Sequence, residues 1–334
     1  MSSSYSKKYS FKSALKSRLI KEFDFNTFEN IAEIIRGGFG TVYHPSTETY
    51  YLVLQYAKDG DLRTYLRNNF KSIDWKIKFK LAKDITSGLR CIHKENIAHK
   101  DLHLKNILVH EGRLFITDLR LSQSSDTNSK SMAGGVIAYT DLKYLRNQVE
   151  FKRNQASDIY SLGILFWELS SGIPPFDNLP SFEMYRKVTS NEREKPINGT
   201  PKDYIKIYSN AWKNDPKQWP TINYIFDSLE NIKLENISNE TNDNQDFQFE
   251  AHFDNQSQTS SKDFVSIPPS SNWGEVTDIG KGILSATLMN GKKTVALKSI
   301  VFANADLFVS ELKQYSRASS HENIIGFYGI SQKG

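Results

Sequence analysis

One polar loop at the end of a long helix constrains the fold of this chain more than any other stretch. Apolar residues recur at helical spacing through 75–93, which predicts a helix with one buried face. The loop reads His99-Lys100-Asp101-Leu102-His103-Leu104-Lys105-Asn106, and Asp118 follows twelve residues after its end. Two short apolar runs in between predict two short strands. The sequence therefore predicts a helix, a polar loop and two strands, with an aspartate directly after the second strand.

The spacing His-x-Asp-x-x-x-x-Asn followed by Asp resembles the catalytic loop and metal-binding aspartate of the eukaryotic protein kinases. The resemblance implies that Asp101 accepts the proton of the attacking hydroxyl and that Lys105 stabilises the transferring phosphate. It also implies that Asn106 and Asp118 hold Mg²⁺. The expected cofactors are accordingly ATP and Mg²⁺, and the expected partners are ATP and protein substrates.

Further stretches resemble the same family in the family's own order. Asp61 is placed to cap a helix that begins directly after it. The most apolar helix is expected to open at Ser157 and to end at Gly172. In kinases the aspartate at the position of Asp158 accepts hydrogen bonds from the catalytic-loop backbone. The resemblance is to the tyrosine-kinase-like group, and it implies an α+β, two-lobed fold with a complete helical large lobe.

The small lobe resembles a kinase only in part. Residues 34–43 resemble a glycine-rich loop, in which glycines let backbone N–H groups approach the ATP phosphates. Residues 50–57 resemble the last small-lobe strand and the hinge, with Leu54 as gatekeeper. The residues of this part assigned to the nucleotide are Gly37, Gly38, Gly40, Val42, Leu54, Gln55, Ala57 and Asp61. Between these stretches the chain lacks the expected Val-Ala-x-Lys strand and the helix that carries a glutamate.

The missing pieces occur at the other end of the chain. Residues 294–298 read Thr-Val-Ala-Leu-Lys, so Lys298 is expected to contact the α/β-phosphates and Glu311 to pair with it. Two accounts are open: the tail completes the kinase domain in permuted order, or it begins a second domain. We favour completion, because an isolated small lobe of about 60 residues buries little surface. The expected division is a disordered basic extension (1–25), a kinase domain lacking those two elements (26–230), a disordered polar linker (231–271) and a small-lobe fragment (272–334).

Four departures from the family pattern and the displaced position of Lys298 favour a second interpretation, a pseudokinase that binds nucleotide or proteins without efficient catalysis. Ile35 stands at the first glycine position and Arg120 at the glycine of Asp-Phe-Gly. Lys143 and Trp219 replace the glutamate and arginine of a buried ion pair. Losing one partner would cost about 3 to 5 kcal/mol, whereas replacing both can be nearly neutral, so we interpret the double change as compensated.

The leading interpretation is a protein kinase that transfers the γ-phosphate of ATP to Ser/Thr hydroxyls. His103 stands where Ser/Thr kinases commonly carry lysine, and Lys105 where tyrosine kinases place a basic residue, so Tyr specificity stays open. A net charge of +5 without a basic cluster between aromatics argues against nucleic-acid binding. The single cysteine, Cys91, fits a reducing compartment, and no apolar run is long enough for a membrane span. We therefore expect a cytoplasmic enzyme with no membrane or nucleic-acid partner.

Overall fold

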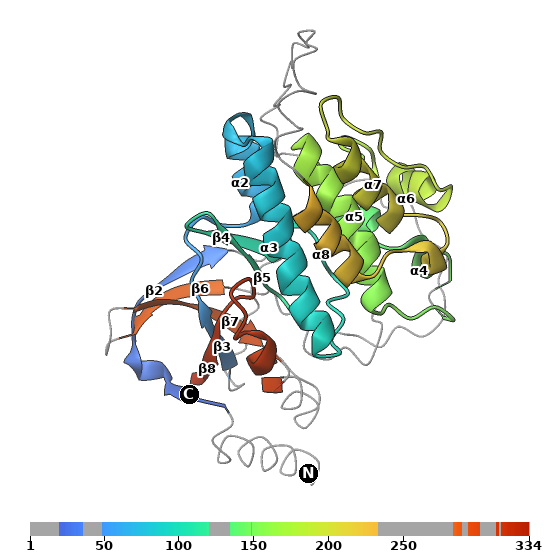
Figure 1. The fold of residues 1–334 in the computed structure, drawn as a ribbon. Coiled ribbons are helices and arrows are strands. Elements are labelled where there is room, and N and C mark those ends of the chain that lie inside the picture. Colours follow the sequence, from blue (N-terminus) through green and yellow to red (C-terminus); the bar gives the residue numbers. More distant parts are fainter. Residues whose placement is uncertain are drawn as a thin grey trace.

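A computed structural model of the chain describes residues 20–35, 49–119, 134–147, 149–232, 283–288, 293–300, 312–313 and 315–333. Figure 1 shows a sheet on one side, a mainly helical part on the other, and helix α3 (Trp75–Lys94) between them. The fold is of mixed α+β type and two-lobed, as the resemblance implies. Most of the predicted basic extension and of the predicted linker lies outside the described residues.

Strands from the two ends of the chain interleave in the larger sheet. Its order is β1-β8-β3-β7-β6-β2. The strands are β1 (Glu22–Asp24), β2 (Phe28–Ile35), β3 (Thr49–Gln55), β6 (Ile283–Leu288), β7 (Lys293–Ile300) and β8 (Phe327–Lys333). Strand β3 has antiparallel neighbours on both sides, with Leu52 opposite Lys298 of β7 and opposite Ile330 of β8. The orange and red strands of the tail thus lie between blue ones from the beginning of the chain (Figure 1).

The side chains of β3 are buried on both faces of the sheet. Alternate residues of a strand point to opposite faces. Leu52 and Leu54 belong to the main core that the sheet shares with the helices. Tyr51 and Val53 belong to a second cluster, which Leu297 of β7 also joins. The prediction of a buried strand is confirmed, and β3 ends at Gln55.

The end of the predicted disordered extension is part of the sheet, so that prediction is wrong for residues 20–25. Strand β1 runs parallel to β8, and Lys21 accepts a hydrogen bond from the Ile330 N–H across 2.9 Å. Ile20 is buried, and the Phe25 ring lies 6.0 Å from that of Phe28. The composition of residues 20–25 could not predict this pairing, because their partner strand, β8, comes from the other end of the chain. The unpaired edge of β8 is what β1 binds.

The helical part is organised around α5 (Gln155–Ser171), of which the residues from Ser157 onward are buried. It contacts α3, α7 and the 3₁₀ segment η4. The other elements of this part are α2 (Leu62–Asn69), α4 (Leu142–Arg146), α6 (Ser181–Thr189), α7 (Lys202–Ala211), α8 (Ile222–Asn231), the strand pair β4 (Ile107–His110) and β5 (Arg113–Ile116), and the 3₁₀ segments η2 (Phe70–Ser72), η3 (Leu104–Asn106), η4 (Gly134–Tyr139) and η5 (Pro216–Gln218). A further 3₁₀ segment, η1 (Phe25–Thr27), links β1 to β2.

Helix α5 begins earlier than the sequence predicts. Asn154 caps it, accepting hydrogen bonds from the N–H groups of Ala156 and Ser157, and the Ser157 hydroxyl accepts one from the Asn154 N–H. This reciprocal capping box satisfies backbone donors that a helix end otherwise leaves unpaired. The predicted end is confirmed, since Gly172 has φ 76° in the left-handed region that glycine adopts without strain.

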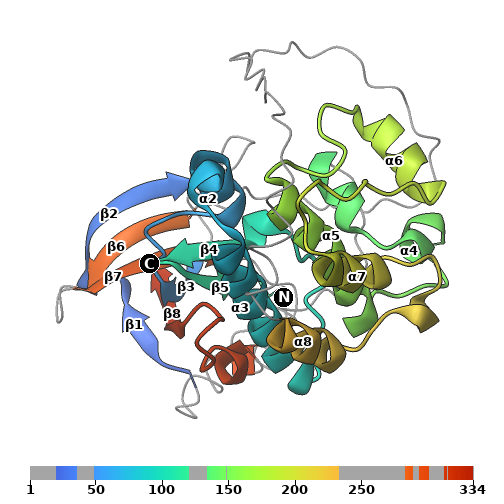
Figure 2. The same cartoon turned by 45° about the horizontal axis from the view of Figure 1, so that its top comes forward.

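The tail also packs on the helical part through a close contact with α3. The Ile116 N–H donates to the Asn323 carbonyl and the Ile116 carbonyl accepts from the Ile325 N–H, each across 2.9 Å. A Cβ added to Gly88 of α3 would lie 2.7 Å from the Asn323 carbonyl oxygen, so only glycine allows this approach. Figure 2 shows the red helical turn of the tail beside α3. Its residues Leu312 and Tyr315 are buried in the main core.

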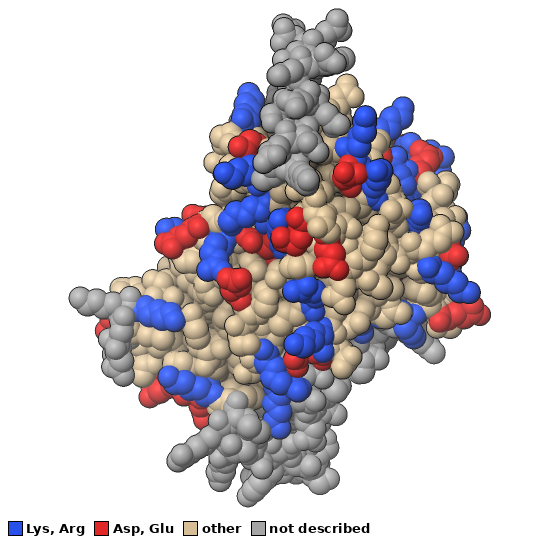
Figure 3. Space-filling view, viewed as in Figure 1, with Lys and Arg blue, Asp and Glu red and all other residues tan. Residues whose placement is uncertain are grey.

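Exposed ion pairs contribute little to holding the tail in place. Lys and Arg are interspersed with Asp and Glu on the face drawn in Figure 3. Two of the described ion pairs from tail to body, Arg113–Glu322 and Arg317–Glu95, involve largely exposed side chains, and exposed pairs are worth about 0–1 kcal/mol. A third, Lys298–Asp118, is mostly buried. Strand pairing and buried apolar contacts therefore carry the attachment. Within the described residues, no helix combines the length and the apolar character needed to cross a membrane.

Candidate active site

A buried aspartate fixes the backbone of the predicted catalytic loop. Asp158, on α5, accepts hydrogen bonds from the N–H groups of His99 (2.8 Å) and Lys100 (2.7 Å). Its carboxylate also lies 2.9 Å from Nε2 of His93. Lys100 has φ 64°, a conformation that costs a non-glycine residue about 1–2 kcal/mol. The hydrogen bonds from Asp158 oppose this cost, and the predicted anchoring of the loop is confirmed.

The loop brings Asp101 and Asn106 together. The Asn106 side-chain Nδ2 donates to the Asp101 carbonyl across 2.8 Å and to Asp101 Oδ2 across 3.3 Å. Because the amide nitrogen is bonded in this way, its oxygen is directed away from Asp101. His99 is structural, since its Nε2 lies 2.9 Å from the Thr117 carbonyl and ties the loop to the segment before Asp118. Lys105 is exposed on the same loop.

His103 lies against the carboxylate of Asp101. Its Nε2 is 3.9 Å from Asp101 Oδ1, and its ring lies edge-on to Tyr139 with 6.1 Å between centroids. Burial lowers the pKa of His103 to about 4, against the opposing influence of Asp101. The imidazole is therefore neutral at pH 7, so the loop has no cation at this position.

The predicted metal-binding aspartate meets the predicted phosphate-binding lysine. Asp118 follows β5 with φ 56°, in the left-handed region. Lys298 of β7 reaches it, with 2.6 Å between its Nζ and Asp118 Oδ1. The side chains are only 12% and 20% exposed, so water screens the pair weakly. The interleaved sheet thus places a residue of the tail in contact with Asp118.

The predicted hinge residues lie where β3 leaves the sheet. Leu54 is buried, and the Gln55 N–H donates to the Gly326 carbonyl across 2.8 Å. Ala57, half-buried, follows in the segment that leads to α2. Asp61 caps α2 as predicted, accepting from the Thr64 N–H across 3.0 Å and from the Thr64 hydroxyl across 2.9 Å. Both Asp61 oxygens therefore have a role in the helix cap.

Several predicted site residues lie outside the described part of the chain. They are Gly37, Gly38, Gly40 and Val42 of the glycine-rich stretch, and Glu311. Arg120, one of the departures from the family pattern, lies outside it too. The strand that precedes the glycine-rich stretch is described, and Ile35 at its end, in β2, is opposite Ile283 at the start of β6.

Comparison with known proteins assigns the family. A family model described as "Protein tyrosine and serine/threonine kinase" matches residues 12–229, more than half of the chain. The chain belongs to the protein kinase family. The matched range ends before the tail, so the role of the tail rests on the strand pairing and on the Lys298–Asp118 contact.

Individual kinases are similar to this chain over about half of its length. They include a probable serine/threonine-protein kinase, roco5, of Dictyostelium discoideum (28% identical, 51% of this chain) and mitogen-activated protein kinase kinase kinase 10 of Xenopus laevis (29%, 54%). A tyrosine-protein kinase transforming protein, Fps, of an avian sarcoma virus is 26% identical over 54% of this chain. The chain spans 7%, 19% and 34% of the length of these three relatives.

One buried ion pair of the kinase domain escaped the sequence predictions. Arg63 of α2 donates from Nε and Nη2 to the two carboxylate oxygens of Glu168 on α5, across 2.9 and 3.1 Å. Its Nη2 also donates to the Tyr139 hydroxyl across 2.8 Å. Burial raises the pKa of Glu168 to about 7, and Arg63 opposes the rise. A glutamate within the most apolar helix was the available signal, because a buried carboxylate needs a partner.

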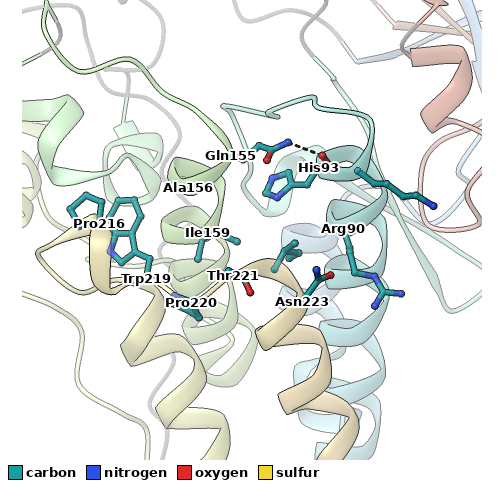
Figure 4. Close-up of a pocket in the computed structure, with 12 residues that line it drawn as sticks. Arg90, His93, Gln155, Ala156, Ile159, Pro216, Trp219, Pro220, Thr221 and Asn223 are labelled. Atoms are coloured by element: carbon teal, nitrogen blue, oxygen red, sulfur yellow. Dashed lines mark hydrogen bonds between the residues drawn. The ribbon is translucent and has the colours of Figure 1, made fainter.

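The replacements at the family's ion-pair positions, Lys143 and Trp219, bury no charged side chain. The Trp219 indole donates to the Lys213 carbonyl across 2.7 Å and packs beside Tyr160, while Lys143 is exposed. Trp219 borders a cavity of about 650 Å³ between the end of α3 and the starts of α5 and α8, shown in Figure 4. Gln155 crosses it to donate to the His93 carbonyl across 2.8 Å. None of the residues lining this cavity is a predicted site residue.

Proposed function

We propose that this chain is an active protein kinase that transfers the γ-phosphate of ATP to Ser or Thr hydroxyls of proteins. The observation that carries the proposal is the 2.6 Å contact of Lys298 with Asp118 beside an intact catalytic loop. Phosphoryl transfer depends on positioning and charge stabilisation, so a lysine brought to the metal-binding aspartate is the part the body of the chain lacked.

The residues of the site fit the chemistry of the proposed cofactors. The Asn106 amide oxygen and the Asp118 carboxylate are the oxygen ligands that Mg²⁺ prefers, and they would hold it. When bound, Mg²⁺ would neutralise charge on the phosphates of ATP. Lys298 would contact the α/β-phosphates, and Leu54, Gln55 and Ala57 would border the adenine.

The protein's own groups would carry the proton transfer. Asp101 would accept the proton of the substrate hydroxyl, and the contact from Asn106 Nδ2 would hold its carboxylate in place. Neutral His103 packs against the same carboxylate without contributing a competing positive charge. Lys105, exposed at the mouth of the loop, would stabilise the transferring phosphate.

The proposed catalytic unit consists of the kinase domain, 26–230, together with the tail, 272–334, and residues 231–271 connect them. The pairing of β3 with β7 and β8 supports completion of the small lobe by the tail rather than a separate second domain. Ser/Thr specificity is supported by the name of one of the three relatives, roco5, whereas the name of another, Fps, is that of a tyrosine kinase.

A pseudokinase is the second candidate, and the contact between Lys298 and Asp118 can also be interpreted in its favour. Lys298 is bonded to Asp118 Oδ1, an oxygen that Mg²⁺ would also need. If this pair persisted when nucleotide binds, the chain would hold ATP without organising the metal.

Phosphate transfer from radiolabelled ATP by the full chain separates the two candidates. The expected result is incorporation into Ser/Thr peptides that exceeds the Asp101→Asn variant by 100-fold or more, since general-base catalysis contributes about 10²–10⁴-fold. Equal incorporation by both proteins, with ATP binding retained, would establish the pseudokinase. Incorporation confined to Tyr peptides would overturn the Ser/Thr assignment.

A further inference from the structure

The strands supplied by the body of the chain, before residue 233, do not pair with one another in the described sheet. Strand β1 pairs with β8, β2 pairs with β6, and β3 pairs with β7 and β8. Every partner in this set comes from the described part of the tail, within 283–333. The tail is therefore the element that joins three otherwise separate strands into one sheet.

Without a tail, the body would expose unpaired strand edges on both sides of β3. Both edges of β3 would lose their ladders, from Tyr50 to Gln55 toward β7 and from Thr49 to Leu54 toward β8. Val53, fully buried in the complete sheet, would lose Leu297 from its cluster. Unpaired strand edges beside apolar side chains are templates for another strand. The strand with the matching register and side chains is that of this tail.

The only covalent connection between body and tail is the fifty-residue stretch 233–282. A stretch of this length has a contour of up to about 165 Å. Every described contact across the junction is non-covalent, and each would be the same if the tail belonged to another copy. A tether of this length corresponds to an effective concentration in the millimolar range. A chain therefore pairs with its own tail in preference to another copy's tail only until the concentration of other copies approaches that range.

We propose that the tail exchanges between copies, so that residues 283–333 of one chain complete the sheet of a second chain. In the exchanged dimer each active site takes Asp101 and Asp118 from one copy and Lys298 from the other. Such exchange of an identical element needs no new interface. The part of the inference that concerns catalysis rests on the proposed kinase function, whereas the exchange itself rests on the sheet alone.

A disulfide between chains tests the exchange without reference to activity. Tyr50 of β3 is opposite Gln332 of β8, and directly opposed antiparallel residues have Cα separations of about 4.5–5.5 Å, which a disulfide spans. One full-length chain carries Tyr50→Cys and the other Gln332→Cys, both with Cys91→Ser. They are mixed from ten micromolar to one millimolar under oxidising conditions. The matched control is a single chain with both cysteines, which forms the bond internally.

The expected result is a disulfide-linked dimer of the two chains whose yield rises with concentration toward the millimolar range. If the control closes its internal disulfide while the mixed chains stay monomeric at one millimolar, the exchange is overturned. If the dimer forms but the wild-type chain transfers no phosphate, the exchange stands and the proposed kinase function is overturned. The failure of one proposal can therefore be told apart from the failure of the other.

Complementation tests whether the exchanged tail completes an active site. Full-length Asp101→Asn and Lys298→Met chains each lack one group, but one site of their exchanged dimer has both. Complete random exchange would give about a quarter of the wild-type rate, because half of the dimers are mixed and one of their two sites is intact. A mixture of Asp101→Asn with the double variant is the control and should stay inactive. If disulfide-linked dimers form and wild type is active, but the mixture recovers no activity, Lys298 does not act in the partner's site.

Discussion

The Lys298 Nζ lies 2.6 Å from Asp118 Oδ1, although 180 positions of sequence separate the two residues. Strand β7 makes the contact possible, because its pairing with β3 sets Lys298 opposite Leu52. Register matters here, since a shift by one residue would move the lysine to the other face of the sheet. The contact therefore depends on a non-local strand pairing.

Lys298→Met should lower kcat/KM for phosphate transfer by roughly 100-fold or more, the usual loss when a preorganised charge at a reacting centre is removed. The matched control is Lys293→Met, on the exposed beginning of the same strand. Steady-state kinetics with a peptide substrate provide the measurement. Equal rates in the two variants would show that Lys298 does not contact the phosphates.

Gly88→Val should loosen the tail while leaving the helical part folded. Its side chain would meet the Asn323 carbonyl, and overpacking typically costs about 1–3 kcal/mol. Hydrogen exchange should rise in 315–333 and stay low in α5. Lys76→Val places the same side chain on an exposed position of α3 and is the control. Equal protection of 315–333 in both variants would contradict the close approach.

Asp158→Asn should destabilise the chain by about 3 kcal/mol, because a fully buried carboxylate that accepts from two backbone N–H groups becomes an amide with donors of its own. Urea unfolding followed by tryptophan fluorescence measures the change. Asp203→Asn, which alters only an exposed pair with Lys206, is the control and should unfold as wild type. A wild-type midpoint for Asp158→Asn would refute its role as the loop anchor.

The stability of the fold should depend on pH through His103. Its pKa is about 4 in the folded chain against an ordinary 6.5, so between these values the unfolded chain takes up a proton that the folded chain does not. The free energy of unfolding should therefore fall as pH drops from 6.5 to 4, by up to about 3 kcal/mol from this group.

His103→Gln should remove that part of the pH dependence, as measured by urea unfolding at pH 7 and pH 4.5. His110→Gln, at the end of β4, controls for the loss of an imidazole elsewhere. An unchanged slope between the two pH values in His103→Gln would show that His103 is not held neutral by burial.

Local patterns predicted the elements around the catalytic loop well. The helix expected at 75–93 is observed as α3, and Asp61 caps α2, because helical periodicity and caps are decided within a few neighbouring residues. The start of α5 was missed by two residues because the capping box of Asn154 went unrecognised. The pairing of Arg63 with Glu168 was missed because no local pattern brings α2 to α5.

The sequence by itself determined which groups the loop carries and how they are spaced. Asp101, Asn106 and Asp118 lie within eighteen positions, so one loop and one strand pair suffice to assemble them. Only the tertiary structure decided that Lys298 joins them and that residues 22–24 enter the sheet. The Lys298 contact and the pairing of residues 22–24 each depend on strands that are more than a hundred residues apart in the sequence. Burial and register in the whole sheet decide which strands pair, so neighbouring residues alone do not reveal it.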